Sequence, residues 1–435
     1  MKIALINHGC AKNLVDAELM LGMLDKKGYK ITLDDKEADI VIVNTCSFIH
    51  DAEQESVQSI LEMIESGKRV IVTGCLSQKY NDELKKAIPE LSGMVGTSNL
   101  TDVVKIIEDL EQGKEYESII SDKPHYYYPE ETARQQITVG ASSYLKIGEG
   151  CNYKCGYCII PKLRGPYISR PIENIVKEAK ELVAKGVTEI ILIAQDTSSY
   201  GIDLYGKQAL PELLRELNKI DNLSWIRIMY AYPTQMTDEL IDAIATLDKV
   251  VKYVDIPLQH SHPEVLKRMR RPVMDYTKLV EKIRAKIPNV SVRTTLIVGY
   301  PGETEEEFEH LYNFVKNVKF DRMGAFEYSR EKGTYSYGLK PQIDDKIKKE
   351  RRDKLMELQQ KISLENNQKY IGSTLKCIVE GYTDDGVIIL RSEHDAPEID
   401  GVVYATSDRE IIPGDLEYVR ITKVDEYDLF GEVED

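Results

Sequence analysis

Long apolar runs are missing from this sequence. No stretch approaches the ~20 consecutive apolar residues that a membrane-spanning helix needs. Residues 1–10, MKIALINHGC, have the pattern of a strand rather than that of a secretion signal. Hydrophobic residues make up 42% and charged residues 30% of the 435-residue chain, which is ordinary for a globular protein of two or three domains. We therefore expect no membrane association.

Basic residues are scarce toward the end of the chain. The net charge is −16, and from Ile371 onward five basic residues stand against seventeen acidic ones, so this segment carries −12 and the rest −4. A module that binds nucleic acid is expected to carry the opposite sign, because phosphate contacts dominate such binding. An acidic segment can equally be a solvated surface that aids solubility. The charge alone leaves both interpretations open.

Cysteine is the residue type whose placement says most about function. The seven cysteines lie at positions 10, 46, 75, 151, 155, 158 and 377. An odd count without a secretion signal argues for reduced thiols and a cytoplasmic location. Residues 150–164 read GCNYKCGYCIIPKLR, in which Cys151, Cys155 and Cys158 are separated by three and then two residues.

Three close thiolates can ligate three irons of a four-iron cluster and leave the fourth iron open. A structural zinc site is closed by four ligands, and the next His or Cys after Cys158 is the distant His260. The spacing favours an open iron–sulfur cluster over zinc or a disulfide. With Tyr157 before the last cysteine, it resembles the CxxxCxxC signature of radical SAM enzymes, in which the open iron binds S-adenosylmethionine. That resemblance implies that Tyr157 lies at the cofactor.

The first domain, expected over 1–116, alternates apolar β-branched runs with amphipathic stretches of helical spacing. The runs, at 2–8, 38–46 and 68–75, predict strands buried on both faces of a doubly wound parallel sheet. Cys10, Cys46 and Cys75 each follow one of these strands, at the sheet edge where ligands bind. A free cysteine is also a common core residue, but three at equivalent strand ends predict a second metal centre, again with an open iron.

The central domain, with a trailing helix, is expected over 137–366, after a linker at 112–136. Six strand-like runs alternate with helical stretches and lie at 143–148, 188–196, 224–232, 252–259, 291–300 and 322–329. They predict a partial (β/α)₆ barrel, with the cysteine loop at its carboxyl mouth. Polar residues at the strand ends are where a bound nucleoside would find hydrogen-bond partners. Our candidates for S-adenosylmethionine contacts, besides Tyr157, are Gln195, Asp196, Arg293 and Gly299.

The third domain, expected over 367–435, has short alternating strands with turn signals between them. The runs at 374–381, 386–392 and 416–424 predict a small antiparallel β-barrel. Cys377 alternates in phase with Leu375 and Val379, so we expect it to be a core residue rather than a metal ligand.

This order of domains resembles the methylthiotransferases of the radical SAM superfamily, whose terminal module is a TRAM domain. Four phrases are similar to the RimO-type members, which modify an aspartate of small-subunit ribosomal protein S-twelve: CIIPKLRGPYISRPI, IAQDTSSYG, DIPLQH and RMRRP. The alternative members modify tRNA adenosine and usually carry a Gln-Asn pair where this chain has Gln195–Asp196. An alternative of another class is a non-catalytic iron–sulfur or zinc assembly factor.

The resemblance implies two 4Fe–4S clusters and two uses of S-adenosylmethionine. Cys151, Cys155 and Cys158 would hold the cluster that generates a radical, and the N-terminal cysteines an auxiliary cluster that carries the sulfur. The cofactors do the hard chemistry, so no catalytic residue beyond the ligands is expected. A reductant such as flavodoxin or ferredoxin is implied as a partner. The acidic third domain suits a basic ribosomal protein, and tRNA is not expected to bind.

Overall fold

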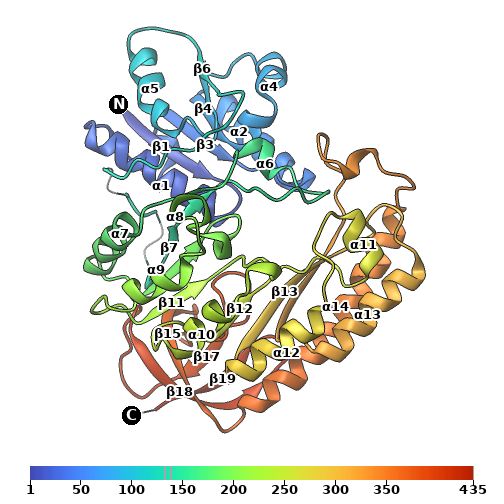
Figure 1. Ribbon diagram of the computed structural model, residues 1–435. Coiled ribbons are helices and arrows are strands. Elements are labelled where there is room, and N and C mark those ends of the chain that lie inside the picture. Colours follow the sequence, from blue (N-terminus) through green and yellow to red (C-terminus); the bar gives the residue numbers. More distant parts are fainter. Residues whose placement is uncertain (132–133, 138–139, 435) are drawn as a thin grey trace. The chain divides into compact units, whose positions relative to one another are not determined.

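The computed structural model describes residues 1–131, 134–137 and 140–434 (Figure 1). Parts of the expected linker (132–133) and central domain (138–139), and the acidic Asp435, lie outside the described residues. The chain divides into two compact units, each described here by itself. The N-terminal unit comprises Met1–Val139, Gly148–Arg170 and Ser329–Tyr337; the barrel unit comprises Gly140–Ile147, Pro171–Tyr328 and Gly338–Asp435.

A six-stranded parallel sheet forms the core of the N-terminal unit, as the apolar runs predict. Its order is β2 (Lys30–Ile31), β1 (Lys2–Asn7), β3 (Ile40–Thr45), β4 (Arg69–Gly74), β5 (Gly93–Val95) and β6 (Glu117–Ile119). Its main helices are α1 (Ala11–Lys26), α2 (His50–Glu65) and α5 (Val103–Glu111). Every residue of β3 is buried, as expected for a strand covered on both faces.

The interpretation of 112–136 as a linker is wrong for its first part. β6 pairs with β5 in parallel, so the sheet continues to Ile119. Two of the tyrosines farther along also pack on this unit. The Tyr126 hydroxyl donates to Asp16 Oδ1 at 3.1 Å, and the Arg170 guanidinium lies 3.5 Å above the Tyr128 ring.

Six parallel strands of the barrel unit confirm the strand–helix repeat. They are β7 (Ser142–Lys146), β10 (Glu189–Ile193), β11 (Trp225–Ile228), β12 (Tyr253–Asp255), β13 (Ser291–Val298) and β14 (Arg322–Glu327). They form two three-stranded sheets, β7–β10–β11 and β12–β13–β14. Between the two sheets, Ile226 of β11 bridges Val250, and the Ala231 N–H donates to the Asp255 carbonyl of β12 at 2.9 Å. The barrel is therefore held together between β11 and β12 by scattered bonds rather than by a regular ladder.

Helices cover the outside of these strands. They include α7 (Ile172–Ala184), α9 (Leu210–Leu217), α10 (Asp238–Thr246), α12 (Tyr276–Lys286) and α13 (Glu305–Val318). A capping box of Thr304 and Glu307 begins α13. The predicted trailing helix is α14 (Asp345–Asn367), which runs beside α13 and packs on β14 (Figure 1).

The last domain is a closed five-stranded barrel. Its order is β15 (Thr374–Tyr382), β16 (Ile388–Ser392), β17 (Val403–Thr406), β19 (Leu429–Val433) and β18 (Leu416–Val424). The predicted small β-barrel is confirmed: its other pairs are antiparallel, and β17 and β19 run parallel. Cys377 is fully buried in the apolar core, as its alternation predicts.

Buried charges join this small barrel to the amino ends of the β/α strands. The Glu189 carboxylate accepts from Arg227 Nε at 2.8 Å, from Ser142 Oγ at 2.7 Å and also from Arg391 of the small barrel. The Arg227 guanidinium donates in addition to the Glu393 carbonyl at 3.0 Å. Burial alone would raise the pKa of Glu189, but the two arginines lower it to about 2.

Two aspartates of the small barrel take part in the same junction. Arg322 on β14 pairs with Asp395, with Nε 2.7 Å from Oδ1. Asp400 accepts from the Tyr253 hydroxyl at 2.6 Å and pairs with Arg293 at 3.3 Å. Part of the C-terminal acidic excess therefore lies at an internal junction rather than on a solvated surface.

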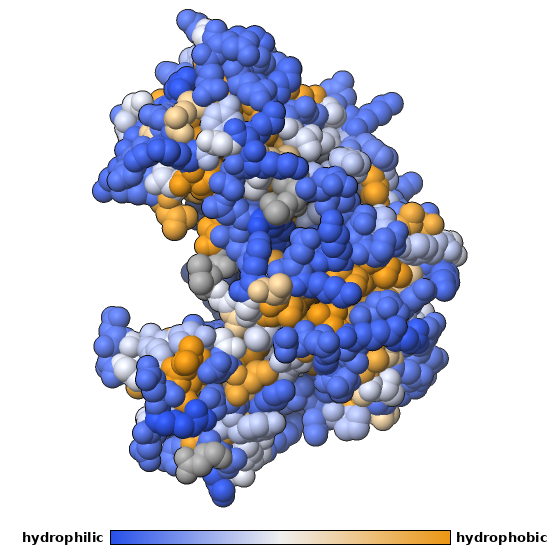
Figure 2. All heavy atoms as spheres, turned by 90° about the vertical axis from the view of Figure 1, so that its left-hand side faces the viewer, coloured by the Kyte–Doolittle hydropathy of each residue, from blue (hydrophilic) through white to orange (hydrophobic). Residues whose placement is uncertain are grey.

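Hydrophilic side chains cover most of the face shown in Figure 2, and apolar atoms gather in smaller patches. Within the described residues, no helix is long and apolar enough to cross a membrane.

We predict that Glu189→Gln destabilises the barrel unit by about 3–5 kcal/mol, because it removes the carboxylate that pairs with buried Arg227 and one of the two carboxylates that pair with buried Arg391. The depressed pKa of Glu189 also means that its contribution is complete above its ordinary pKa and is lost as the pH falls toward 2. The stability of the variant should therefore fall less between pH 5 and 3 than that of the wild type. Thermal unfolding followed by circular dichroism measures both effects. The exposed Asp238→Asn on α10 is the control and should change little; equal losses in both variants would contradict the prediction.

Candidate functional site

The three N-terminal cysteines lie where β1, β3 and β4 end. Cys10 caps α1, Cys46 follows β3, and Cys75 begins the short helix α3 (Cys75–Lys79). Gly9 permits their close approach: it has φ +95°, and a Cβ there would lie 2.8 Å from the Cys46 Cβ. The three cysteines thus lie at the carboxyl ends of neighbouring strands, near enough for their charges to interact.

Asn13 holds these strand ends together. Its Nδ2 donates to the His8 carbonyl at 2.9 Å and to the Thr45 carbonyl at 3.0 Å. Its own carbonyl accepts from the Asn44 side chain at 2.8 Å. These bonds tie the ends of β1 and β3 to α1, so the backbone around Cys10 and Cys46 is fixed by buried polar contacts.

The three thiols influence one another electrostatically. Desolvation opposes ionisation of Cys10, but the positive charges of Lys12 and Arg164 lower its pKa. Burial raises the pKa of Cys46 to about 11 and raises that of Cys75, and the neighbouring thiols add to both shifts. Cys10 is exposed, whereas Cys46 and Cys75 are buried. Cys10 is therefore the thiol best prepared to act as a thiolate.

The second cysteine group lies in a loop of the same unit. Cys151, Cys155 and Cys158 are half-buried, and so is Tyr157 beside them. The Cys158 N–H donates to the Cys155 carbonyl at 3.1 Å, which closes a turn. The loop is also held by residues 329–337, because Ser336 N–H donates to the Gly156 carbonyl at 2.8 Å.

The chain after this loop packs against the first cysteine group. Leu163, at the end of the single-turn helix α6 (Ile160–Leu163), forms a buried cluster with Ile159 and Cys75. The Leu163 carbonyl also accepts from the Thr97 hydroxyl. The loop of the second group is thereby attached to a ligand candidate of the first.

Arg164 has a structural role that the sequence analysis missed. It is 2% exposed, and its guanidinium donates to Asp16 Oδ2 at 2.7 Å, to Glu149 Oε2 at 3.4 Å and to Asn13 Oδ1. The Nη2 atom also lies 3.6 Å from Cys75 Sγ. The one sign of this role in the sequence is that Arg164 lies six residues after Cys158, the last cysteine of the loop.

The two cysteine groups offer the kind of ligand that iron–sulfur clusters take, because each iron of a four-iron cluster takes its own thiolate. Two groups of three thiols, one of them beside Lys12 and Arg164, are a donor set that fits anionic clusters.

The other predicted contacts lie in the barrel unit, and some have structural duties. Asp196 accepts from the N–H groups of Ser198 and Ser199 at 3.0 and 3.3 Å, and so shapes the loop after β10. Its burial raises its pKa. Gln195, next to it, is half-buried. Arg293 lies near the amino end of β13, where Asp255 and Asp400 engage it.

Gly299 stands at the carboxyl end of β13 with φ +71°, and its N–H donates to Glu303. A Cβ there would overlap the Lys348 side chain. On the neighbouring strand end, the side-chain oxygen of Gln259 is buried without a partner among the described residues. An unpaired acceptor at this edge suits a ligand that carries N–H or O–H donors, as S-adenosylmethionine does.

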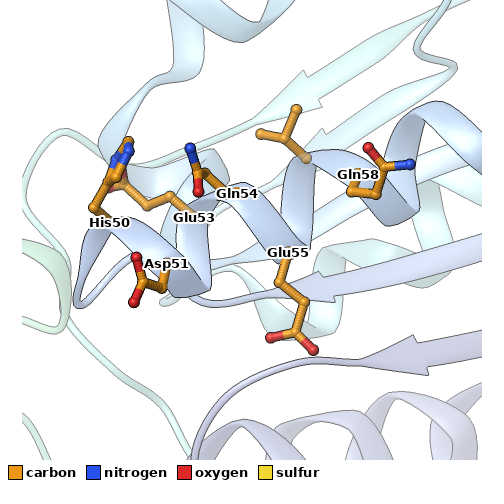
Figure 3. A pocket seen from close by; sticks show the side chains of 7 residues that line it. His50, Asp51, Glu53, Gln54, Glu55 and Gln58 are labelled. Atoms are coloured by element: carbon orange, nitrogen blue, oxygen red, sulfur yellow. The ribbon is translucent and has the colours of Figure 1, made fainter.

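A shallow pocket on α2 does not belong to this set. Its lining comes from the first turns of one helix, and Figure 3 shows the labelled side chains spread along the outside of that helix. Glu53, among them, is engaged by Lys79 at 2.6 Å, and Lys79 also pairs with Glu331 at 3.0 Å. This pocket carries stabilising ion pairs rather than convergent ligands.

Three family models match the chain. The radical SAM superfamily matches residues 145–315, the Uncharacterized protein family UPF0004 matches residues 2–96, and the TRAM domain matches residues 371–433. The matches cover the two cysteine groups and the small barrel.

Curated relatives match over nearly the whole length. A protein of Caldanaerobacter subterraneus subsp. tengcongensis, named ribosomal protein uS12 methylthiotransferase RimO, is 51% identical over 436 residues, 99% of each chain. A Clostridioides difficile protein of the same name is 48% identical over 441 residues, 100% of this chain and 99% of the other. Among solved structures, the radical S-adenosylmethionine methyltransferase TsrM from Kitasatospora setae matches with a TM-score of 0.56 at 14% identity, over 74% of this chain and 72% of that one. The last match shows the fold alone.

We predict that iodoacetamide labels Cys10 of the metal-free protein much faster than Cys46 at pH 7–8, because the thiolate is the reactive form. Labelling of Cys46 should rise only as the pH approaches about 11. Cys377, whose pKa burial also raises, is the unreactive control. Peptide mass spectrometry after timed labelling measures the rates; equal rates at Cys10 and Cys46 would contradict the assigned environments.

Proposed function

Because this chain belongs to the RimO family of radical SAM methylthiotransferases, we propose that its substrate is ribosomal protein uS12 (the small-subunit protein S-twelve) and that it inserts sulfur and a methyl group at the β-carbon of an aspartate. The single observation that carries this proposal is full-length identity of 51% to a protein named for that activity. The presence of both cysteine groups in this chain supports it.

The family implies S-adenosylmethionine and a 4Fe–4S cluster as cofactors. We assign that cluster to Cys151, Cys155 and Cys158, and a second, auxiliary cluster to Cys10, Cys46 and Cys75. When bound, these groups supply the one-electron chemistry that breaks an unactivated C–H bond, together with the sulfur and methyl group to be transferred. An external one-electron donor, such as flavodoxin or ferredoxin, completes the set of partners.

The chain's own residues hold and shield these groups. Burial shields Cys46 and Cys75, two of the three auxiliary ligands, from water, and Asn13 fixes the strand ends that carry the thiols. Tyr157, Gln195 and Gly299 remain our candidates for contacts to S-adenosylmethionine. Asp196 contributes by shaping the loop that carries Gln195. Arg293 is the weakest candidate, because two carboxylates already engage it.

We propose that the substrate docks on an acidic tip of the small barrel, formed by Asp384, Asp385, Asp408 and Glu410. All four are exposed. The two loops that carry them are joined by a hydrogen bond from the Tyr382 hydroxyl to the Ile411 carbonyl. Ile412, 62% exposed, adds an apolar contact beside them. An acidic tip with an apolar residue suits a lysine- and arginine-rich protein loop and repels phosphate backbones.

The deciding experiment compares uS12 and tRNA as substrates under the same anaerobic, reducing conditions. Protein reconstituted with two four-iron clusters should place a methylthio group on an aspartate of uS12, and mass spectrometry should find none on tRNA adenosine. The reverse result would move the chain to the tRNA-modifying members. If neither substrate is modified although both clusters are present, the proposed enzymatic activity is wrong. That result would favour the alternative of a non-catalytic iron–sulfur assembly factor.

We predict that Asp384→Lys combined with Asp385→Lys weakens uS12 binding several-fold, with a smaller effect at high salt, because exposed charges are screened over about 8 Å at physiological ionic strength. Fluorescence anisotropy with labelled uS12 at two salt concentrations measures this. The matched control, Glu281→Lys with Glu309→Lys, places the same charge change on exposed faces of α12 and α13. An equal loss in both double variants would show that net charge acts, rather than the acidic tip. Asp395 is left unchanged, because it is buried against Arg322.

A further inference from the structure

Arg164 connects the two cysteine groups inside the N-terminal unit. It follows α6, whose Leu163 packs on Cys75, and it belongs to the same short stretch of chain as Cys151, Cys155 and Cys158. One guanidinium nitrogen, Nη1, is held by Asp16 on α1, and the other, Nη2, lies 3.6 Å from Cys75 Sγ. The contact thus joins the loop of one group to a ligand candidate of the other.

The charged groups around this contact are all buried. Arg164 is 2% exposed, Asp16 4% and Glu149 0%, so water screens none of them effectively. The Coulombic attraction of Glu149, Cys75 and Asp16 outweighs desolvation and keeps the pKa of Arg164 above its usual range. The guanidinium is therefore a permanent positive charge beside Cys75, and the two carboxylates that hold it act against its effect.

A charge of this kind acts on an iron–sulfur cluster in a known direction. One-electron reduction makes a cluster one unit more negative. Hydrogen bonds and positive charges at its thiolate sulfurs stabilise the reduced form, and so they raise its reduction potential. Carboxylates nearby have the opposite effect.

We propose that Arg164 is a positioning residue that raises the reduction potential of the cluster at Cys10, Cys46 and Cys75. This inference rests on the proposed function, which places a cluster there. Nη2 donates to Cys75 Sγ, while Asp16 and Glu149 hold the guanidinium and act against its effect. The potential of the auxiliary cluster thereby depends on the loop that carries the other cysteine group.

The test uses the full-length chain with Cys151→Ala, Cys155→Ala and Cys158→Ala. In this variant only the cluster at Cys10, Cys46 and Cys75 contributes to the measured signal. After anaerobic reconstitution, the cluster is titrated with dithionite as the one-electron donor, and its midpoint potential is read from the electron paramagnetic resonance signal. Arg164→Gln should lower the midpoint and Asp16→Asn should raise it. Arg164→Lys, which keeps the charge but loses the planar fork, should fall between wild type and Arg164→Gln.

Arg134→Gln is the matched control. Arg134 is 6% exposed and pairs with Glu18 on the same helix α1, with Nη2 2.6 Å from Oε2. Its loss should cost stability without moving the midpoint. If the midpoint potential falls in Arg164→Gln and rises in Asp16→Asn, a general loss of stability cannot be the cause, because it would not shift the potential in opposite directions.

The outcomes separate the inference from the proposed function. If the triple cysteine variant is folded but holds no iron, the auxiliary cluster itself is wrong. If it holds one four-iron cluster and Arg164→Gln leaves the midpoint unchanged, the role of Arg164 is wrong. If Arg164→Gln fails to retain iron, Asp16→Asn decides, because it keeps the guanidinium: a midpoint that does not rise overturns the inference.

Discussion

Buried charge must be paired, and both units of this protein are organised by that constraint. In the N-terminal unit, Arg164 is held by Asp16 and Glu149 in a buried position beside the Cys75 thiol. In the barrel unit, Glu189 lies between Arg227 and Arg391, both of them buried. Losing one member of such a set leaves an uncompensated charge, which costs far more than an exposed ion pair contributes. These sets therefore decide which segments must stay in contact.

The sequence was sufficient where the signal was local and periodic. The β-branched runs predicted β1, β3 and β4, and the parallel topology then brought Cys10, Cys46 and Cys75 to one edge. The six strands of the barrel unit were also foreseen. Short strands with charged residues were missed: β6 is three residues long, begins with Glu117 and lies in the segment interpreted as a linker.

Long-range contacts between charged residues could not be predicted. Arg164 and Asp16 are 148 residues apart, and no local pattern marks them as partners. The same limit affected the acidic C-terminal segment, which was interpreted as a solvated or partner-binding surface although Asp395 is buried against Arg322. Counting charges gives the net value correctly but not their location. The chemistry that we propose for the site rests on the cysteines, which the sequence displays, whereas its electrostatic environment becomes visible only in three dimensions.

The junction between the small barrel and the β/α strands bears on how far this protein is modular. A domain attached by a linker can be exchanged or deleted with little effect on its neighbour. Here residues 391–400 supply Arg391, Asp395 and Asp400 to partners on β10, β13 and β14. A chimera that replaced the small barrel while omitting this loop would leave Glu189 and Arg293 without these partners at the amino ends of the strands. An exchange of the small barrel between related proteins must therefore carry residues 391–400 together with partners that match them on the β/α strands. The two domains are thus expected to evolve together rather than as exchangeable modules.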